Sequence, residues 1–233
     1  MPISSRFRGS PQVCWAAFLP AVEAEVRTLL AAVPGCHDWD HTERVLHNAR
    51  HLARREKADP VVVAFAALLH DVGRAREMED EGQTDHAALG ADMALELLPR
   101  LGVDDVAFVE HVAACVRTHR WRRRGGAGPA SLEARVVYDA DKLDSIGAVG
   151  LARAFHFAGR IGARLHNTEA EALAAASYSR GDTAYREYLV KLRHVPERLL
   201  TEHGRNLARK RHAFMVRFFA EFHRELRGQP HPL

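Results

Sequence analysis

The chain has 233 residues, of which 47% are hydrophobic and 27% are charged, and this balance excludes a chain that is disordered throughout. The length fits one domain with a sizeable core. The formal net charge of +3 is too small to indicate nucleic-acid binding, and three widely spaced cysteines exclude a disulfide framework or a cysteine-ligated zinc site.

The first half of the chain shows the spacing of apolar residues that predicts helices. Aspartates at the helix starts and proline or glycine at the ends set the expected limits. Residues 71–84 and 120–130 are predicted to be loops, the second of them exposed and basic. The expected helices cover residues 12–33, about 38–57 with Asp38 or Asp40 as the cap, 60–70 with Pro60 in the first turn, 85–101 with Asp85 as the cap, and 104–119 with Asp104 at the start.

The second half continues the same pattern. Residues 164–181 are less regular, and windows of period-two alternation are few. We therefore predict an all-α protein of one domain with roughly nine helices. The expected helices of this half cover residues 131–144 beginning at Ser131, 146–163, 183–193 and 205–226, with a turn around Pro196 between the last two.

The beginning of the chain imitates a short signal peptide, because Arg6 and Arg8 precede an apolar run from Val13 to Val22. Pro20 interrupts this run, which passes directly into an amphipathic segment, so a helix of the domain is favoured. No stretch approaches the ~18 apolar residues that span a bilayer. We expect a cytoplasmic protein with no membrane partner.

His70 and Asp71 follow nine apolar residues, Val61 to Leu69, which are apolar enough to form a buried helix. The pair must then lie at the edge of the core, where unpaired polar groups cost several kcal/mol. A divalent metal would satisfy both side chains, because neutral imidazole and carboxylate are ligands for Mn, Fe, Zn or Ni.

Two further histidines need separate interpretations. His37-Asp38 is a second His-Asp dipeptide, but it lies at a junction of loop and helix, where Asp38 is more simply a helix cap. His41 should point inward, either as a ligand or, as the pattern alone favours, as a core histidine with a hydrogen-bonded neighbour. It shares an apolar helix face with Val45, Asn48 or Ala49, and Leu52.

The segment from Asp139 to Asp144 places three carboxylates within six residues, and these repel one another unless cations offset them. One interpretation is a helix end with solvated acids and a local ion pair to Lys142. The other makes one aspartate a metal ligand and Lys142 a phosphate contact. Tyr138, Leu143 and Ile146 mark the buried side of this helix.

His41, His70-Asp71 and Asp141, in this order within a helical chain, resemble the HD superfamily of metal-dependent phosphohydrolases. The segments 37–45, 70–74, 139–147 and 188–226 are similar to a bacterial branch of small HD hydrolases that includes nucleotide pyrophosphohydrolases. The resemblance covers about residues 12–226. It implies a single HD-domain helical bundle over residues 1–233, with core helices at about 37–163 and a C-terminal helical extension at about 183–226.

The resemblance also implies a role for each matched residue. It makes His41, His70, Asp71 and Asp141 the ligands of one divalent metal ion, which can be Mn, Mg, Fe, Co, Ni or Zn. His86 and His119 would bind a second metal in binuclear members, but an adjacent His-His pair typical of those members is missing here. The residues expected to act in catalysis are Asp71, Arg74, Lys142 and Asp144, and those expected to contact substrate are Arg74, His86, His119 and Lys142.

The sequence allows two interpretations for Asp144 and two for the acidic residues that follow the His70-Asp71 pair. Asp144 either orients a ligand histidine or water, or forms a salt bridge with Arg44 or Arg153. The acids Glu77, Glu79, Asp80 and Glu81 form either part of a lid or, as favoured, a solvated surface.

The expected reaction is the hydrolysis of a phosphate ester or phosphoanhydride of a small molecule, a nucleotide in the favoured reading, by metal-activated water. One alternative is an HD-fold regulatory protein that binds a nucleotide without hydrolysing it. The other is an RNA-associated protein, suggested by five arginines around Trp121, although nucleic acid is not the expected partner. The sequence does not indicate an oligomeric state. The five arginines are Arg117, Arg120, Arg122, Arg123 and Arg124.

Overall fold

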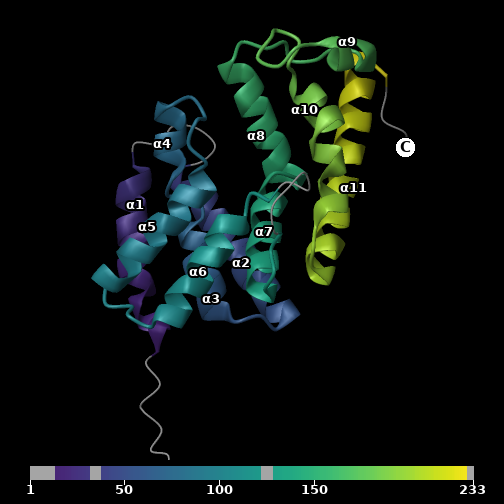
Figure 1. Cartoon of the computed structure of the whole chain (residues 1–233). Coiled ribbons are helices and arrows are strands. Elements are labelled where there is room, and N and C mark those ends of the chain that lie inside the picture. The colour runs from purple at the N-terminus through teal and green to yellow at the C-terminus, as the bar shows by residue number, and fades with distance from the viewer. Residues whose placement is uncertain (1–13, 32–37, 122–127, 230–233) are drawn as a thin grey trace, which may run out of the picture.

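A computed structural model describes residues 14–31, 38–121 and 128–229 of the chain (Figure 1). Every regular element within these ranges is a helix, which confirms the predicted all-α class. The elements in chain order are η1 (Trp15–Phe18), α1 (Leu19–Leu30), α2 (Trp39–Glu56), α3 (Pro60–Leu69), α4 (Arg74–Glu79), α5 (His86–Arg100), α6 (Val106–Thr118), α7 (Leu132–Asp144), α8 (Gly147–Arg160), α9 (Glu169–Ala174), α10 (Ala184–Val190), η2 (Leu192–Arg198) and α11 (Glu202–Leu226).

Most helix starts lie where the side chains of the sequence predict them. Asp38 accepts a hydrogen bond from the backbone N–H of His41, so its role as a cap is confirmed, while His37 lies outside the described residues. Asp85 and Ser131 cap α5 and α7 as predicted. The prediction for α6 is wrong by one residue, because Asp105 rather than Asp104 accepts from the helix.

Three irregular segments contain helices that the sequence did not indicate. α4 lies in the predicted loop 71–84, and α9 lies in the less regular segment 164–181. Where a turn around Pro196 was expected, the chain forms η2. α4 and α9 have six residues each, so their apolar residues are too few to show a helical spacing in the sequence. Helices of this length are not stable alone and need further stabilising contacts. α9 is stabilised by a capping box: the Thr168 side chain accepts a hydrogen bond from the backbone N–H of Glu171, and the Glu171 side chain accepts one from the backbone N–H of Thr168.

Two groups of helices flank α7 (Figure 1). The first group contains α1 to α6, and the second contains α8, α10 and α11, which stand side by side. α2 packs against α3 and α7, α5 packs against α6, and α11 packs against both α7 and α8. No helix in the described part of the chain is long and apolar enough to cross a membrane.

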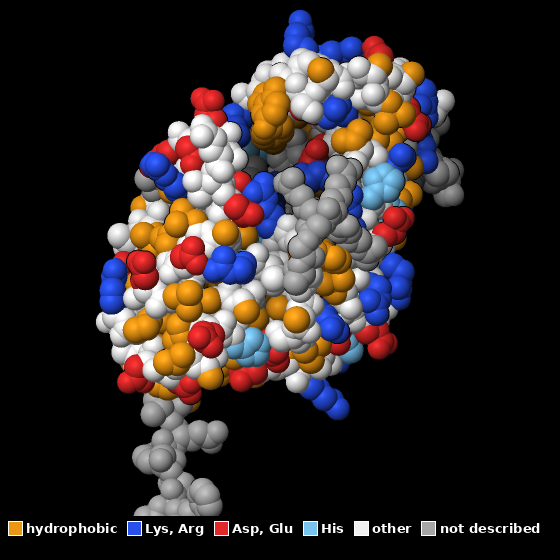
Figure 2. Space-filling view, in the orientation of Figure 1, with side chains coloured by type: hydrophobic (Ala, Val, Ile, Leu, Met, Phe, Trp, Pro, Cys, Tyr) orange, Lys and Arg blue, Asp and Glu red, His pale blue; other side chains and the backbone are white. Residues whose placement is uncertain are grey.

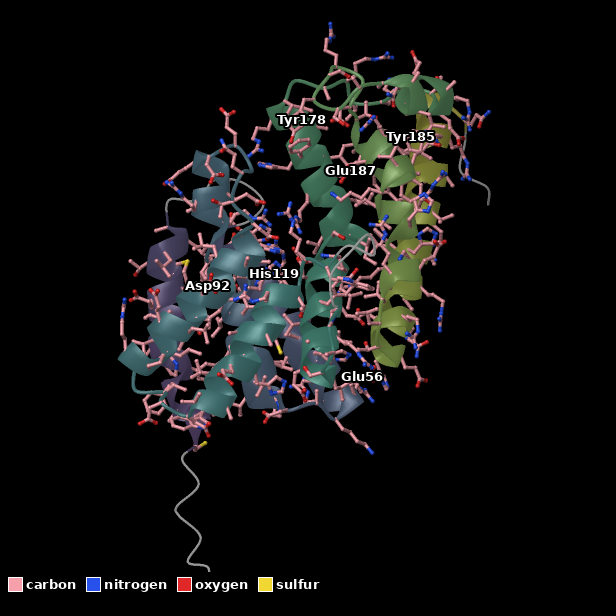
Figure 3. All side chains as sticks on the ribbon, in the orientation of Figure 1. Glu56, Asp92, His119, Tyr178, Tyr185 and Glu187 are labelled. Atoms are coloured by element: carbon pink, nitrogen blue, oxygen red, sulfur yellow. The ribbon has the colours of Figure 1, made fainter. Side chains whose placement is uncertain are left out.

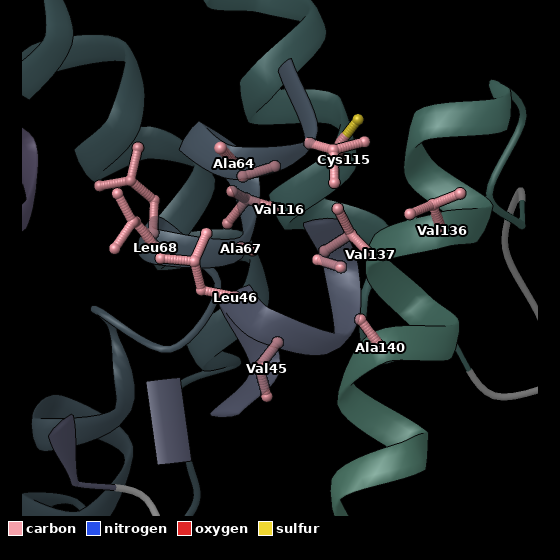
Figure 4. Packing of buried hydrophobic residues seen from close by; sticks show 14 of the residues in the cluster. Val45, Leu46, Ala64, Ala67, Leu68, Cys115, Val116, Val136, Val137 and Ala140 are labelled. Carbon is pink, nitrogen blue, oxygen red and sulfur yellow. The ribbon is translucent and has the colours of Figure 1, made fainter. Parts of the chain in front are cut away.

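The core is centred on α3, whose residues from Val62 to Leu69 are all buried. Around it pack Leu46 of α2, Val116 of α6 and Val137 of α7 (Figure 4). Because the whole circumference of α3 is covered, the residue that ends it, His70, lies at the edge of the core as predicted.

Asp139 joins α7 to the beginning of α11. Its buried carboxylate accepts hydrogen bonds from the backbone N–H groups of Leu200 and Thr201 and from the Thr201 hydroxyl, at 2.7 to 2.8 Å. Thr201 in turn caps α11. A side chain on Gly204 would clash with this carboxylate, since a Cβ there would lie nearer to the Asp139 oxygen than atoms can approach. Asp139 is thus a structural residue that points toward α11.

Candidate metal centre

His41 and His70 face each other inside the first group of helices, and both are fully buried. The position of His41 follows from the predicted apolar face of α2, because Val45, Ala49 and Leu52 are buried with it. The two Nε2 atoms are 3.2 Å apart. The structure therefore brings together two histidines that are 29 residues apart in the chain.

The hydrogen bonds of these rings determine which nitrogens carry protons. His70 Nδ1 lies 2.8 Å from the carbonyl oxygen of Ala67, which only accepts, so Nδ1–H donates. His41 Nδ1 donates to the carboxylate of Asp144 at 2.8 Å. In the tautomers with the proton on Nδ1, the two rings direct their Nε2 lone pairs at each other, and two facing lone pairs repel unless a cation lies between them. This donor arrangement fits a divalent metal.

Asp71 and Asp141 contribute carboxylate oxygens to the same space. Asp71 Oδ2 lies 3.6 Å from the Nε2 atoms of both His41 and His70, and Asp141 Oδ1 lies 3.5 Å from His41 Nε2. His41, His70 and Asp71 offer ligand atoms that all lie within 4.8 Å of one another. The four residues expected from the resemblance thus converge, with Asp141 at the partly exposed side.

The protonation states of these groups suit metal binding. Burial lowers the pKa of His70 to about 3, so its imidazole is neutral at physiological pH. Burial alone would raise the pKa of Asp141, but the ammonium group of Lys142 at 2.7 Å holds that pKa well below its ordinary value. The site therefore presents the neutral nitrogen of His70 and the anionic oxygens of Asp141 without the need to release protons from these two groups.

A second donor cluster shares Asp71 with the first. His86 and His119 are buried, and their Nε2 atoms are 3.2 Å apart. Asp71 Oδ1 lies 3.2 Å from His86 Nε2 and 3.6 Å from His119 Nε2. His119 Nδ1–H donates to the carbonyl of Val116, so the lone pair of its Nε2 points inward, while His86 Nδ1 lies 2.8 Å from Glu77 and 3.2 Å from the guanidinium of Arg120. This second cluster is therefore a second space that suits a cation.

Asp144 combines the two roles that the sequence left open. Besides His41 it accepts hydrogen bonds from Arg44 at 2.8 Å and from Arg153 at 2.6 Å. Burial raises its pKa, but the hydrogen bonds from His41 and Arg44 and the charge of Arg153 outweigh burial and hold the pKa well below its ordinary value. Asp144 is thus an anion that fixes the orientation of the His41 ring and is itself held by two arginines.

Replacing Asp144 with asparagine tests this orienting role. The amide keeps the shape of the side chain but removes the charge that fixes the His41 tautomer, so we expect metal affinity to fall about 10- to 100-fold. Titration of metal-free protein with Mn²⁺ measures the change. Asp92→Asn is the matched control, because that carboxylate is largely exposed and pairs only with Arg117 among the interactions described. Equal metal affinity of Asp144→Asn and wild type would contradict the role.

Glu77 is a site residue that the sequence did not reveal. The favoured interpretation placed it on a solvated surface, but its side chain is buried and pairs with Arg74, Arg120 and His86. The cationic partners lower its pKa although burial opposes them. The spacing of three residues between Arg74 and Glu77 is the one feature of the sequence that indicates an ion pair here. The partner Arg120 lies 43 residues further along the chain, where no local pattern reveals it.

The two cations expected to contact phosphate lie beside the ligands. Arg74 donates through Nη2 to Asp71 and through Nη1 to Glu77, while its Nε is buried without a hydrogen-bond partner among the described residues. Lys142 pairs with Asp141 and lies 5.0 Å from the centre of the Tyr138 ring. Both side chains are therefore held by ion pairs to carboxylates of the first donor cluster, and both are partly exposed.

The chain is a helical bundle whose buried histidines and aspartates form clusters of donor atoms that could hold a metal ion. Within this class of helical bundles, the chain belongs to the HD superfamily. The HD domain model matches residues 38–146, which run from the cap of α2 to just beyond α7. Bacillus subtilis YpgQ is 33% identical over 205 residues, which cover 87% of this chain and 91% of that protein.

Solved structures agree with this assignment. A predicted HD superfamily hydrolase from an uncultured Thermotogales bacterium has 32% identity and a TM-score of 0.65, and the match covers 89% of this chain and 92% of that one. B. subtilis YpgQ in complex with ADP has 28% identity and a TM-score of 0.69, with 91% and 96% covered. The chain therefore has the fold of HD-superfamily hydrolases, and its relatives support a hydrolase-type enzyme.

Proposed function

We propose that this protein is a metal-dependent phosphohydrolase that hydrolyses a phosphate ester or phosphoanhydride of a nucleotide. The observation that carries the proposal is that the Nε2 lone pairs of His41 and His70 face each other beside the carboxylates of Asp71 and Asp141. A structure of the relative YpgQ contains ADP, and this supports a nucleotide as the substrate class.

In the proposal, His41, His70, Asp71 and Asp141 bind one divalent ion, of which Mn, Mg, Fe, Co, Ni and Zn are candidates. When bound, the ion supplies a Lewis acid that makes water nucleophilic at neutral pH and polarises a phosphoryl oxygen. Asp71 holds the two donor clusters together, because one of its oxygens faces each cluster. Asp144 keeps the ring of His41 in the tautomer that presents Nε2.

The basic residues around the clusters are proposed to stabilise the negative charge of the transition state. In the proposal, Arg74 and Lys142, which flank the donor clusters, contact phosphoryl oxygens. His86 and His119 are proposed as further substrate contacts. A second ion between them is the alternative, and metal analysis separates the two.

The alternatives from the sequence have weaker support. An idle regulatory protein does not need all four of the proposed ligand residues, and in this chain all four converge. For an RNA-associated protein, Arg122, Arg123 and Arg124 lie outside the described residues, and Arg117 and Arg120 are paired with Asp92 and Glu77. We therefore propose a phosphorylated small molecule, and neither nucleic acid nor a membrane, as the partner.

The proposal is tested with a panel of nucleotides and other phosphate esters after removal of metal by a chelator. We expect no release of phosphate or pyrophosphate from the metal-free protein, and release from at least one nucleotide after addition of Mn²⁺, Mg²⁺, Co²⁺ or Ni²⁺. Because the ligands are buried, restoration should saturate at stoichiometric amounts of a tightly bound ion. Binding of nucleotides without turnover under every metal condition would favour the regulatory alternative.

A further inference from the structure

A pocket of about 380 Å³ lies at the junction of α7, α8 and α10. This volume is within the range of small-molecule sites, about 300 to 1,000 Å³. Its wall includes Ser145 at the end of α7, Arg153 and Phe157 of α8, Tyr178, and Glu187 of α10. Figure 3 shows Tyr178 beside one end of α8 and Glu187 between α8 and α10.

The pocket adjoins the metal centre through α7. Asp141 and Ser145 are one helical turn apart and lie on the same face, with a rise of about 6 Å between them. Arg153, which lines the pocket, contacts Asp144, and Asp144 contacts His41. Figure 2 shows a hollow between the two groups of helices, with basic and acidic side chains at its rim. A ligand with phosphates at the metal centre can therefore extend its other end into the pocket.

The charges of the pocket argue against a phosphate inside it. Each lining cation is already paired with a carboxylate: Arg153 with Asp144 at 2.6 Å, Arg186 with Asp182 at 2.9 Å and Lys191 with Glu187 at 2.6 Å. An added phosphate would have to compete with these pairs. The pocket instead suits an uncharged ligand that accepts and donates hydrogen bonds.

Tyr178 supplies a flat surface at this pocket. Its side chain is 76% exposed, and its ring packs edge-to-face against Phe157 with centroids 5.8 Å apart. The backbone at Tyr178 has the unusual φ of +60° and is held by a hydrogen bond from its N–H to Asp182 at 2.7 Å. An exposed aromatic ring on a fixed backbone leaves its face open for stacking.

We propose that this pocket is the nucleoside subsite, in which the nucleobase stacks on Tyr178 while the phosphates lie at the metal centre. The inference rests on the proposed function, because it takes the position of the phosphates from that proposal. Tyr178 is then a residue that determines the class of substrate: it selects phosphates attached to a flat ring over inorganic phosphates.

The test compares ADP with inorganic pyrophosphate, since both carry a diphosphate and only ADP has a nucleoside. Calorimetric titrations use the Mn²⁺-loaded wild-type protein and the variants Tyr178→Ala and Tyr178→Phe. We expect Tyr178→Ala to weaken ADP binding on the order of 10- to 100-fold and to leave pyrophosphate binding unchanged. Tyr178→Phe should bind both probes as the wild type does, because it keeps the ring.

Leu165→Ala is the matched control, because Leu165 is also exposed and lies in the same irregular segment. Unchanged ADP binding in Tyr178→Ala, or an equal loss for both probes, would overturn the subsite. So would equal affinity of the wild type for ADP and pyrophosphate. The proposed function fails on a different result, namely no turnover of any nucleotide by metal-loaded protein, which leaves the binding comparison intact.

Discussion

His70→Ala is expected to lose the bound metal ion and to reduce the rate of hydrolysis by more than 100-fold. Removing a residue that only hydrogen-bonds to a metal ligand lowers metal affinity or activity by about 10- to 100-fold, and removing a ligand itself should have a larger effect. His70 is fully buried and contributes one of two inward lone pairs. Without it, His41 and the two carboxylates cannot complete the donor set. Elemental analysis after dialysis measures the metal, and the released phosphate measures activity.

The same analysis determines the number of ions. We expect one ion in the wild-type protein and none in His70→Ala, whereas two ions in the wild type would place the second between His86 and His119. Asp71→Asn is a second variant with an unchanged side-chain shape, and it should also lose the ion. His156→Ala, at an exposed position of α8, is the control. Full metal content with unchanged hydrolysis in His70→Ala or Asp71→Asn would rule out this metal centre.

Asp139→Ala is expected to lower the free energy of unfolding by about 3 kcal/mol, because it leaves two buried donors and one partly buried donor without an acceptor. The donors belong to Leu200 and Thr201, so the loss weakens the start of α11. Chemical denaturation measures the change. The folded fraction should still bind metal, since Asp139 points away from the donor clusters.

Asp141→Asn provides the contrast. This variant should keep nearly the wild-type stability and lose metal affinity and activity, because Asp141 is partly exposed and faces His41. The two aspartates are only two residues apart, so the pair of variants separates structure from function within one helix. Loss of metal in Asp139→Ala with intact stability would reverse the assignment.

The sequence contains enough information for the local features of the site. The apolar residues before His70 require a buried helix, so the position of His70 at the core edge follows directly. The periodicity of α2 likewise predicts the inward direction of His41. Caps such as Asp38 and Asp85 act within a few residues, and therefore local patterns reveal them.

Contacts over long sequence separations account for what could not be predicted. Asp139 and Asp141 look alike in sequence, and what distinguishes them is Thr201, 62 residues after Asp139. The choice of Asp141 rested on the resemblance. Glu77 lies in an acidic segment typical of solvated surface, and only its distant partner Arg120 explains its burial. The Tyr178 pocket joins three elements and leaves no periodic signal.

The clasp between Asp139 and Thr201 also bears on the modularity of the domain. The match to the HD model ends at residue 146, yet Asp139 inside that segment accepts hydrogen bonds from donors that lie more than 50 residues beyond its end. A protein truncated at that border would retain every proposed metal ligand but lose the donors of Leu200 and Thr201 and the packing of α11 against α7. We therefore expect that residues 38–146 do not fold as an independent unit, and that a fusion protein which preserves the fold must include the C-terminal helices.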